Sequence, residues 1–268
     1  MCANDSLRRY LEFAVETAYL AGRLTLGYFQ TGLEADFKED LSLVTVADRR
    51  AEELIRQRIE KRYPQHAIVG EEFGLKGTEG SAHRWFVDPI DGTLSFVRGV
   101  PLYAVLIGLE IEGEIEVGVA YFPGLNEMLS AATGHGTWWN GRRVHVSAEP
   151  SIRNSVVAFT DAANFRRHGR QREWAMVQQA TYYRAGWGDA YGHALVATGR
   201  VELMLDPIMN AWDCGPFPPI LREAGGYFGD WQGNRTIFGR EAMSTSDLLL
   251  PEVLALWQEA QAGPAPSS

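Results

Sequence analysis

The chain has 268 residues, of which 46% are hydrophobic and 22% are charged. This composition is typical of a globular protein with a large core, and it excludes disordered, collagen-like and disulfide-rich classes. Because a single hydrophobic core rarely grows beyond roughly 250–300 residues, we expect two closely packed halves, at residues 1–150 and 151–268.

Charge and cysteine content narrow the possible partners. The 34 acidic residues outnumber the 25 basic ones, and the net charge is −9. With only three lysines there is no basic run to follow a phosphate backbone, so nucleic acid is not an expected partner. No run of 18 apolar residues and no signal-peptide pattern occurs, so no membrane association is expected. The two cysteines, Cys2 and Cys214, lie at opposite ends of the chain and give neither a disulfide framework nor a thiolate metal cluster. This cysteine content fits a reducing cytoplasm.

The first half of the chain predicts two helices followed by a sheet. Apolar residues recur at helical spacing over residues 6–29 and 48–63, and Pro64 ends the second run. Short apolar runs at 67–69 and 85–87 each lead into acidic residues, as strands do when they deliver carboxylates to a sheet edge. Further strand-like segments predict an antiparallel meander over 104–111, 115–122, 128–132 and 144–146.

The second half alternates between strand and helix patterns. Helices are expected at 171–180, 187–198 and 213–224. Strands are expected at 155–159, at 201–205 and between the first two of these helices. Such alternation favours a second sheet of the α/β kind. The expected fold class is therefore mixed α/β (α+β), with an antiparallel sheet in the N-terminal half and an α/β sheet in the C-terminal half.

Several familiar catalytic motifs are absent from the sequence. No lysine is followed by Ser or Thr as in a P-loop, no histidine begins a His-Glu-x-x-His helix, and no Gly-x-Ser-x-Gly elbow occurs. The glycines at 134 and 136 lack the third glycine of a dinucleotide-binding turn. Neither an EF-hand loop nor an aspartic-protease motif fits, whereas a glycosidase with paired acids stays open. Carboxylate chemistry is what remains.

Acidic residues stand at the ends of separate predicted elements. The segment 88–93, Asp-Pro-Ile-Asp-Gly-Thr, follows a strand, Glu71 follows another, and Asp48 and Asp213 begin helices. Each acid alone is also explained as a turn, a helix cap or a surface pair. If they converge, they repel one another unless hard cations such as Mg²⁺ neutralise them. Two such ions could hold a phosphate, activate a water and stabilise a departing alkoxide, as hydrolysis of a phosphate monoester requires.

Four motifs resemble those of the inositol monophosphatase superfamily, whose members are Mg²⁺-dependent phosphatases, over nearly the whole chain. In chain order they are Lys38 with Val44-Thr45-x-x-Asp48, Gly70-Glu71-Glu72, the segment 88–93, and Trp212-Asp213 followed by Glu223-Ala224-Gly225-Gly226. The resemblance implies a layered αβαβα sandwich, which suits a meander followed by α/β alternation. It also implies a homodimer.

The resemblance further implies roles for individual residues. One Mg²⁺ would be bound by Glu71, Asp88 and the carbonyl of Ile90, and a second by Asp88, Asp91 and Asp213. A third, weaker ion would lie between Glu71 and waters held by Asp48. Thr93, with Glu71 or Asp48 behind it, would orient the attacking water, and the N–H groups of Gly92 and Thr93 would bind phosphate.

Two further stretches bear on the substrate, by resemblance to the histidinol-phosphate phosphatase branch. Where relatives that accept inositol phosphate show Gly-Thr-Ala-Ala, this chain has Gly-Asp-Ala-Tyr after Trp187, which places an acid at Asp189. Asp206 stands seven residues before Asp213, where the family reaches a substrate hydroxyl with Glu, and Asn210 follows. Asp189 and Asp206 could pair with the ammonium and imidazole of histidinol phosphate, and Trp187 could stack on it. A helix N-terminal acid and a core tryptophan are the structural alternatives.

The leading hypothesis is a Mg²⁺-dependent phosphatase that acts on L-histidinol phosphate. The alternatives are an inositol-1-monophosphatase, a broader sugar or nucleotide phosphatase of the same family, and a binding protein without catalysis. Departures from the family pattern at Leu94, and at Leu41 and Leu43 after Lys38, bear on metal affinity more than on chemistry. Candidates for a dimer surface, each also explained as core, are Ile107, Leu109 and Trp138-Trp139.

Overall fold

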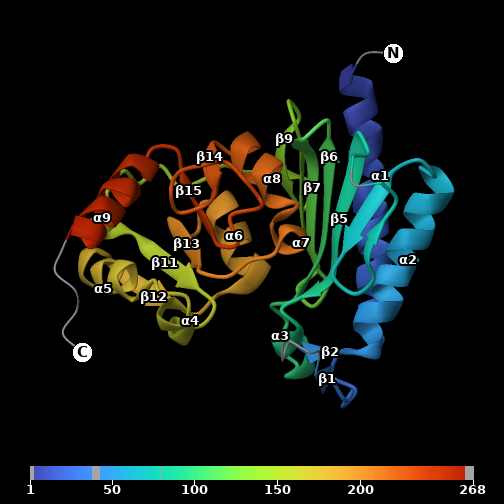
Figure 1. Cartoon of the computed structure of the whole chain (residues 1–268), viewed down its shortest axis with the longest axis horizontal. Helices are drawn as coiled ribbons and strands as arrows, with labels where there is room; N and C mark the ends of the chain where they lie inside the picture. The colour runs from blue at the N-terminus through green and yellow to red at the C-terminus, as the bar shows by residue number, and fades with distance from the viewer. Residues whose placement is uncertain (1–2, 38–42, 79, 263–268) are drawn as a thin grey trace.

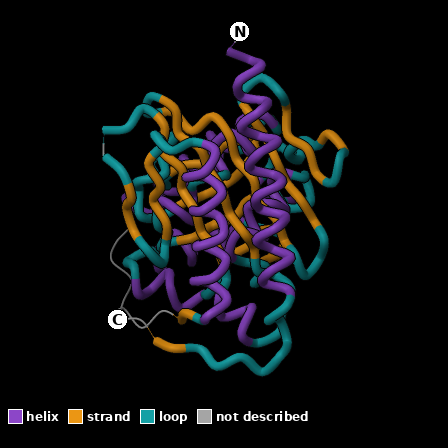
Figure 2. Tube along the Cα trace, turned by 90° about the vertical axis from the view of Figure 1, so that its right-hand side faces the viewer, coloured by secondary structure: helices purple, strands orange, loops and turns teal. Residues whose placement is uncertain are grey.

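The computed structural model describes residues 3–37, 43–78 and 80–262, and its helices and sheets alternate in five layers (Figure 1). The first layer consists of α1 (Ala3–Leu26) and α2 (Val46–Arg62), which run side by side across a sheet in Figure 2. An eight-stranded sheet, a middle layer of helices, a five-stranded sheet and an outer layer of helices follow. The αβαβα sandwich implied by the resemblance is therefore confirmed.

The two helices of the first layer bury an apolar stripe against the sheet. Three small residues at helical spacing on α1 are fully buried: Ala14, Ala18 and Ala21. On α2, Thr45 is the N-cap and Asp48 completes a capping box with it, which fixes where the helix begins. The helices predicted at 6–29 and 48–63 are confirmed, with ends that differ by one to three residues.

The eight-stranded sheet runs in the order β10-β9-β8-β7-β6-β5-β3-β4. Its strands are β3 (Ala67–Gly70), β4 (Gly74–Lys76), β5 (His83–Asp91), β6 (Ala104–Ile111), β7 (Glu114–Phe122), β8 (Glu127–Ala132), β9 (Gly136–Trp139) and β10 (Arg142–Arg143). β3 is parallel to β5, and the strands from β5 to β10 pair antiparallel in sequence order. The expected meander is confirmed. A separate ladder joins β1 (Asp36–Phe37) to β2 (Leu43–Val44).

The last strand predicted for the meander is wrong. In place of a strand at 144–146, the sheet ends in the hairpin of β9 and β10. Its turn, Asn140-Gly141, has positive φ at both residues, as a tight two-residue hairpin requires. The Val144 N–H still donates to the Thr137 carbonyl of β9 at 3.0 Å, whereas the Val146 N–H donates to the Ala224 carbonyl at 3.0 Å. Both side chains pack between the two sheets. A short apolar alternation does not distinguish these two outcomes.

The five-stranded sheet runs in the order β12-β11-β13-β15-β14. Its strands are β11 (Val156–Phe159), β12 (Tyr183–Ala185), β13 (Leu203–Asp206), β14 (Gly226–Gly229) and β15 (Ala242–Ser246). The first three are parallel, as the strand–helix alternation predicts, and the last two add antiparallel. The outer layer consists of α4 (Ala162–Arg167), α5 (Gln171–Ala180) and α9 (Leu250–Ala262), with the 3₁₀ turn η1 (Ile152–Asn154) before β11. Four elements of this half, α4, α9, β14 and β15, have no counterpart among those predicted from the sequence.

The middle layer consists of α6 (Asp189–Ala197), α7 (Ala211–Cys214) and α8 (Phe217–Glu223). The single helix predicted over 213–224 is wrong, because the chain breaks between α7 and α8 at Gly215-Pro216. There the backbone lies directly on the first sheet. A side chain at Gly108 would collide with the Gly215 carbonyl, and one at Gly118 would collide with Pro216. Because Gly108 and Gly118 have no side chains, the backbone at Gly215-Pro216 can approach the sheet closely. The chain breaks there, and α7 is a separate short helix.

Side chains of β5 alternate between two cores. Trp85 and Val87 pack under α1 and α2, while Phe86 packs between the two sheets. Ile107 and Leu109 are also fully buried in the first of these cores, which excludes them from a dimer surface. No helix in the described ranges has the length and apolarity that a membrane span requires. The end of β5 thus enters the space where α3 (Thr93–Val97), α6 and α7 begin.

Candidate metal and phosphate site

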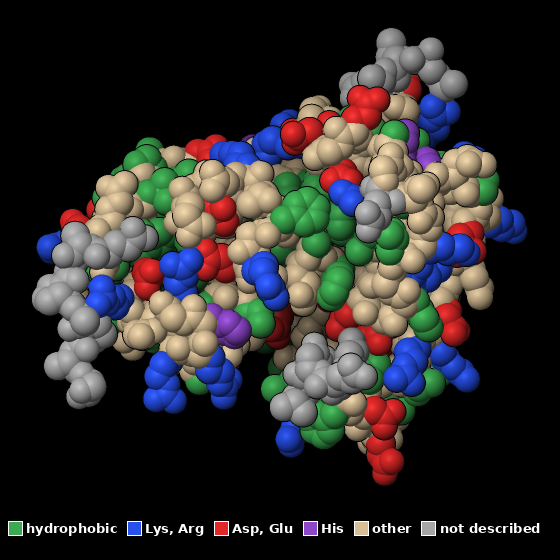
Figure 3. Space-filling view, in the orientation of Figure 1, with side chains coloured by type: hydrophobic (Ala, Val, Ile, Leu, Met, Phe, Trp, Pro, Cys, Tyr) green, Lys and Arg blue, Asp and Glu red, His purple; other side chains and the backbone are tan. Residues whose placement is uncertain are grey.

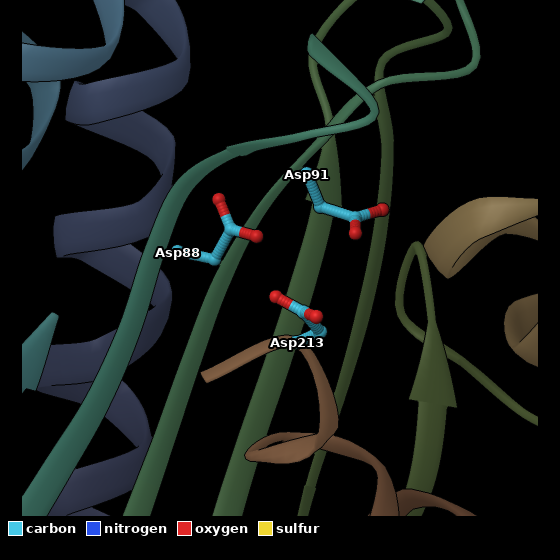
Figure 4. Close-up of side chains that lie close together, drawn as sticks. All are labelled: Asp88, Asp91 and Asp213. Carbon is cyan, nitrogen blue, oxygen red and sulfur yellow. The ribbon is translucent and has the colours of Figure 1, made fainter. Parts of the chain in front are cut away.

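Three aspartates from two elements converge where the halves of the molecule meet. Asp88 and Asp91 lie at the end of β5 and Asp213 lies in α7, and one carboxylate oxygen of each is within 4.8 Å of the others. Figure 4 shows the three side chains close together, with the carboxylates of Asp88 and Asp213 turned toward each other. Residues three apart in a regular strand would face opposite sides. The pairing register of β5 with β6 shifts between Asp88 and Asp91, and this irregularity brings both carboxylates to one side.

Burial and mutual repulsion act on all three aspartates. Burial, followed by the charges of Glu71 and Asp91, raises the pKa of Asp88 well above its usual range. Burial and the charge of Asp189 likewise raise the pKa of Asp91, and burial raises the pKa of Asp213 to about 7. Clustered carboxylate oxygens that repel one another are the ligand set that a hard divalent cation neutralises. The residues present therefore fit a metal site.

Glu71 lies beside this cluster on a different element. It follows β3, and its N–H donates to the carbonyl of Val87, the residue before Asp88, at 3.2 Å. Its charge contributes to the raised pKa of Asp88, Asp213 and Asp48. The structure thus brings together four of the acids that the sequence analysis singled out.

Asp48 has both a capping role and a place at the site. One carboxylate oxygen accepts from the Thr45 N–H at 2.8 Å and from the Thr45 hydroxyl at 2.5 Å. The other oxygen lies 3.5 Å from the Thr93 hydroxyl, which also donates to the Ile90 carbonyl at 3.1 Å. Burial raises the pKa of Asp48 to about 6. The helix-cap explanation of Asp48 is therefore right, and it does not exclude a second contact with Thr93.

A short helix, α3, begins directly after the aspartates. Gly92 is the N-cap of α3 with φ of 78°, a left-handed conformation that favours glycine. Thr93 is the first residue of α3, and both residues line the cavity described below. Both residues thus lie at the cavity, directly after Asp91 in the chain.

A hydrogen-bonded network from the second half of the chain meets the cluster from the other side. The N–H of Ala190, at the start of α6, donates to Asp91 at 2.7 Å. Asp189 has φ of 53°, and its N–H donates to the Thr160 hydroxyl at 2.8 Å. That hydroxyl donates to Asp206 at 2.9 Å. Burial raises the pKa of Asp189 to about 6.

A cavity of about 700 Å³ lies between these two sides. Figure 3 shows acidic side chains gathered where the two halves of the molecule meet. The cavity is lined by polar groups and glycines from both halves and by an apolar wall. The lining residues are Phe37, Leu43, Glu71, Gly92, Thr93, Leu94, Ser95, Val100, Leu102, Thr160, Asp161, Gly186, Gly188 and Asp189.

Not all predicted substrate contacts reach this cavity. Asp189 lines it, whereas Asp206 is buried behind Thr160. Asn210 caps α7 and donates through both its backbone and its side chain to Asp213. Trp187 is 42% exposed and is not a core residue, and its ring lies 6.5 Å from that of Tyr183. Lys38 and Leu41 lie outside the described residues.

Thr160 and Asp161 were missed in the sequence. Both line the cavity directly after β11, which is the middle of three parallel strands. Ligands bind beyond the carboxyl ends of such strands, so the pattern that singled out Asp88 could have found these two residues as well.

Comparison with known proteins agrees with this arrangement. The chain matches the model of the inositol monophosphatase family over residues 6–262. It is 43% identical to a histidinol-phosphatase of Chlorobaculum parvum, over 88% of this chain and 92% of that protein. It is 34% identical to an inositol-1-monophosphatase of Rhizobium meliloti, over 83% and 86% of the two chains. The solved structure of an inositol monophosphatase from Anabaena matches with a TM-score of 0.85 at 27% identity, over 95% and 97%.

Fold, site and relatives together define a metal-dependent phosphatase that hydrolyses phosphate monoesters. The chain belongs to the inositol monophosphatase family.

Proposed function

We propose that this protein is a Mg²⁺-dependent histidinol-phosphatase, which converts L-histidinol phosphate and water to L-histidinol and phosphate. The observation that carries the choice of substrate is that the acidic residue Asp189 lines the same cavity as Thr93 and Glu71. The similarity to the histidinol-phosphatase of Chlorobaculum parvum supports the same choice.

The carboxylate cluster would hold two to three Mg²⁺ ions. Glu71, Asp88 and the Ile90 carbonyl would bind the first, and Asp88, Asp91 and Asp213 the second. The Ile90 carbonyl accepts one hydrogen bond from Thr93 and keeps a second lone pair for this purpose. A third ion would lie between Glu71 and waters held by Asp48. When bound, such ions polarise the phosphate oxygens and lower the pKa of a water molecule.

The side chains around the cluster would orient the reactants. The Thr93 hydroxyl, held between Asp48 and Ile90, is placed to accept a hydrogen bond from the attacking water. Asp48, whose pKa burial raises to about 6, is suited to take up a proton near neutral pH. The N–H groups of Gly92 and Thr93 would bind the phosphate, so that the water attacks in line with the departing alcohol.

Asp189 would recognise the alcohol part of the substrate. Histidinol phosphate carries an ammonium group and an imidazole, and a carboxylate next to either forms a charge-assisted hydrogen bond. Asp206 would act through the Thr160 hydroxyl rather than by direct contact, since Thr160 lies between it and the cavity. Trp187 would contact the substrate only from the rim, and Asn210 would serve by holding Asp213.

The test is phosphate release in the presence of Mg²⁺ from four substrates at matched concentrations. They are L-histidinol phosphate, myo-inositol 1-phosphate, fructose 1,6-bisphosphate and 3′-phosphoadenosine 5′-phosphate. We expect histidinol phosphate to lead in kcat/KM by about 100-fold, which corresponds to roughly 2.7 kcal/mol of transition-state discrimination. Inositol phosphate in the lead would favour an inositol-1-monophosphatase, the alternative that the Rhizobium meliloti relative supports. No release from any of the four would contradict the phosphatase proposal.

We further propose that the protein works as a homodimer in the cytoplasm. The family resemblance supports the dimer, and the cysteine content supports the compartment. Light scattering is expected to give about twice the chain mass of 29.8 kDa. A mass equal to one chain would contradict the dimer.

A further inference from the structure

Three charged residues follow one another at four-residue spacing along α2. They are Asp48, Glu52 and Arg56, and this spacing places them on one face of the helix. All three are buried, and Glu52 is fully inaccessible to solvent. Asp48 contacts Thr93, but the function proposed above gives no role to the other two.

The carboxylate of Glu52 holds the turn that carries Glu71. One oxygen accepts from the Glu72 N–H at 2.7 Å, and the other accepts from the Phe73 N–H at 3.3 Å. Arg56 donates to Glu52 at 2.6 Å and also donates to the Gly74 carbonyl, at the start of β4. Glu52 and Arg56 therefore satisfy the backbone of the β3–β4 turn from both of its ends.

The residue before Glu71 is shaped for this contact. A side chain at Gly70 would collide with the Glu52 carboxylate and with Arg56, so the carboxylate lies directly against the backbone. On the opposite side, the Glu71 N–H donates to Val87 of β5. The backbone of Glu71 is thus fixed between α2 and the strand that carries Asp88.

A buried ion pair is an expensive way to obtain stability alone. Apolar residues of similar volume often stabilise a fold as well or better, whereas charged groups with several directed hydrogen bonds fix a geometry. Apart from the bond between Arg56 and Glu52, the side-chain hydrogen bonds of this pair end on residues 72–74, next to a predicted metal ligand. This placement points to a positioning role.

We propose that Glu52, together with Arg56, is a positioning residue for the metal site. It fixes the β3–β4 turn so that the carboxylate of Glu71 stands beside Asp88. Because Asp48 lies one turn earlier on the same helix face, α2 aligns Glu71 and Thr93 together. This inference rests on the proposed role of Glu71 as a metal ligand.

The test is the binding of Mg²⁺ by the whole protein, measured by titration calorimetry rather than by activity. In Glu52→Gln, at least one turn N–H loses its acceptor, and we expect Mg²⁺ to bind about tenfold more weakly, as for other residues that orient metal ligands. The matched control is Glu173→Gln, because Glu173 is also buried and paired, with Arg170 at 2.9 Å, but lies on α5 in the outer layer. The control is expected to bind Mg²⁺ within twofold of the unaltered protein.

Arg56→Gln separates positioning from simple charge. Loss of a positive charge near the cluster would by itself tighten Mg²⁺ binding. Loss of the Arg56 hydrogen bonds to Glu52 and to the Gly74 carbonyl would instead weaken it. We expect Arg56→Gln to weaken binding, as Glu52→Gln does. If either variant fails to fold, as judged by circular dichroism, Arg56→Lys carries the same test, since it keeps the charge and loses the forked contact.

Three outcomes would overturn the proposal. They are unchanged Mg²⁺ affinity in the folded Glu52→Gln protein, an equal loss in Glu173→Gln, and tighter binding in Arg56→Gln. The variant Glu71→Gln distinguishes a different failure. If it leaves Mg²⁺ affinity unchanged, the metal role proposed for Glu71 is wrong, and with it the basis of this inference.

Discussion

The two sides of the cavity are built in different ways. On the first side, Asp88, Asp91, Gly92 and Thr93 come from one continuous segment at the end of β5, held by neighbouring strands and by α2. On the second side, single residues come from the ends of separate elements: Thr160 follows β11, Asp161 precedes α4 and Asp189 begins α6. A rigid continuous segment suits the chemistry that every phosphate ester shares. Residues at the ends of separate elements can be substituted one at a time without disturbing that segment. We therefore assign phosphate chemistry mainly to the first side and choice of alcohol to the second.

The two sides contact each other through two neighbouring residues at the start of α6, Asp189 and Ala190. The Ala190 N–H donates to Asp91, and Asp189, just before it, lies against Gly92. Asp91 thus depends on both sides, whereas Asp189 reaches the cavity only from the second. Substitutions at these two positions should separate the two roles.

The largest effect is expected from Asp91→Asn, which removes a proposed metal ligand from the first side. Metal stabilisation of the transition state contributes several kcal/mol, so kcat should fall by roughly 1000-fold for any phosphate monoester. Steady-state kinetics at saturating Mg²⁺ measures this, with circular dichroism as the control for folding. A loss of less than tenfold would show that Asp91 is not a ligand.

A smaller and selective effect is expected from Asp189→Asn. Asparagine tolerates the positive φ at this position, so the backbone should stay in place. Loss of a hydrogen bond to a charged group costs about 1.5–3 kcal/mol, so kcat/KM for histidinol phosphate should fall roughly 10- to 100-fold. The control substrate, p-nitrophenyl phosphate, carries no cation and should be hydrolysed at an unchanged rate. Equal losses for both substrates would remove Asp189 from substrate recognition.

Metal removal should change stability in a pH-dependent way. Burial raises the pKa of Asp48 and Asp189 to about 6 and that of Asp213 to about 7, above the unfolded value of about 3.9. The folded state therefore binds more protons than the unfolded state. Without metal, this contribution to stability is fully present below about pH 4 and is lost as the pH rises to about 7.

Mg²⁺ should offset this loss, because it replaces the protons between the carboxylates. At a hundred times its Kd, one bound ion adds about 2.7 kcal/mol. Thermal unfolding with Mg²⁺ and with a chelator should show a larger rise of Tm at about pH 8 than near pH 5.5. The same rise at both values would argue against carboxylate ligands.

The smallest effect is expected from Thr160→Val on the second side. Valine keeps the shape but leaves the Asp189 N–H without its acceptor and Asp206 without its donor. We expect a loss of about 1–3 kcal/mol in the free energy of unfolding and a several-fold lower kcat/KM. Urea unfolding measures the first, and Thr160→Ser, which keeps the hydroxyl, is the matched control. If the serine variant is as unstable as the valine variant, the hydroxyl network is unimportant.

The sequence predicted the first side of the site better than the second. Asp88 and Asp91 could be singled out because they stand together in the short segment 88–93. Glu71 and Asp48 could be singled out because each stands at the end of a predicted strand or the start of a predicted helix. The register shift that turns Asp88 and Asp91 to one side could not be predicted, since a regular strand would separate them. The positions of the second-side residues depend on how the two sheets pack against each other. A local sequence pattern carries no information about that packing.

The same limit explains the errors in the fold. The break at Gly215-Pro216 depends on contact with two glycines of a distant sheet, and 144–146 becomes a core segment because the second half covers it. Asp206 and Asn210 were predicted to contact the substrate, but their side chains bond to Thr160 and Asp213 instead of lining the cavity. Helices with a clear apolar period, such as α1 and α5, were predicted well because local spacing decides them.

The measurement that tests this account most directly is kcat/KM for L-histidinol phosphate and for p-nitrophenyl phosphate in the unaltered protein, Asp91→Asn and Asp189→Asn. We predict that Asp91→Asn lowers both values by the same large factor, and that Asp189→Asn lowers only the value for histidinol phosphate. If Asp91→Asn spares either substrate, or if Asp189→Asn lowers both equally, the division between phosphate chemistry and substrate choice is contradicted.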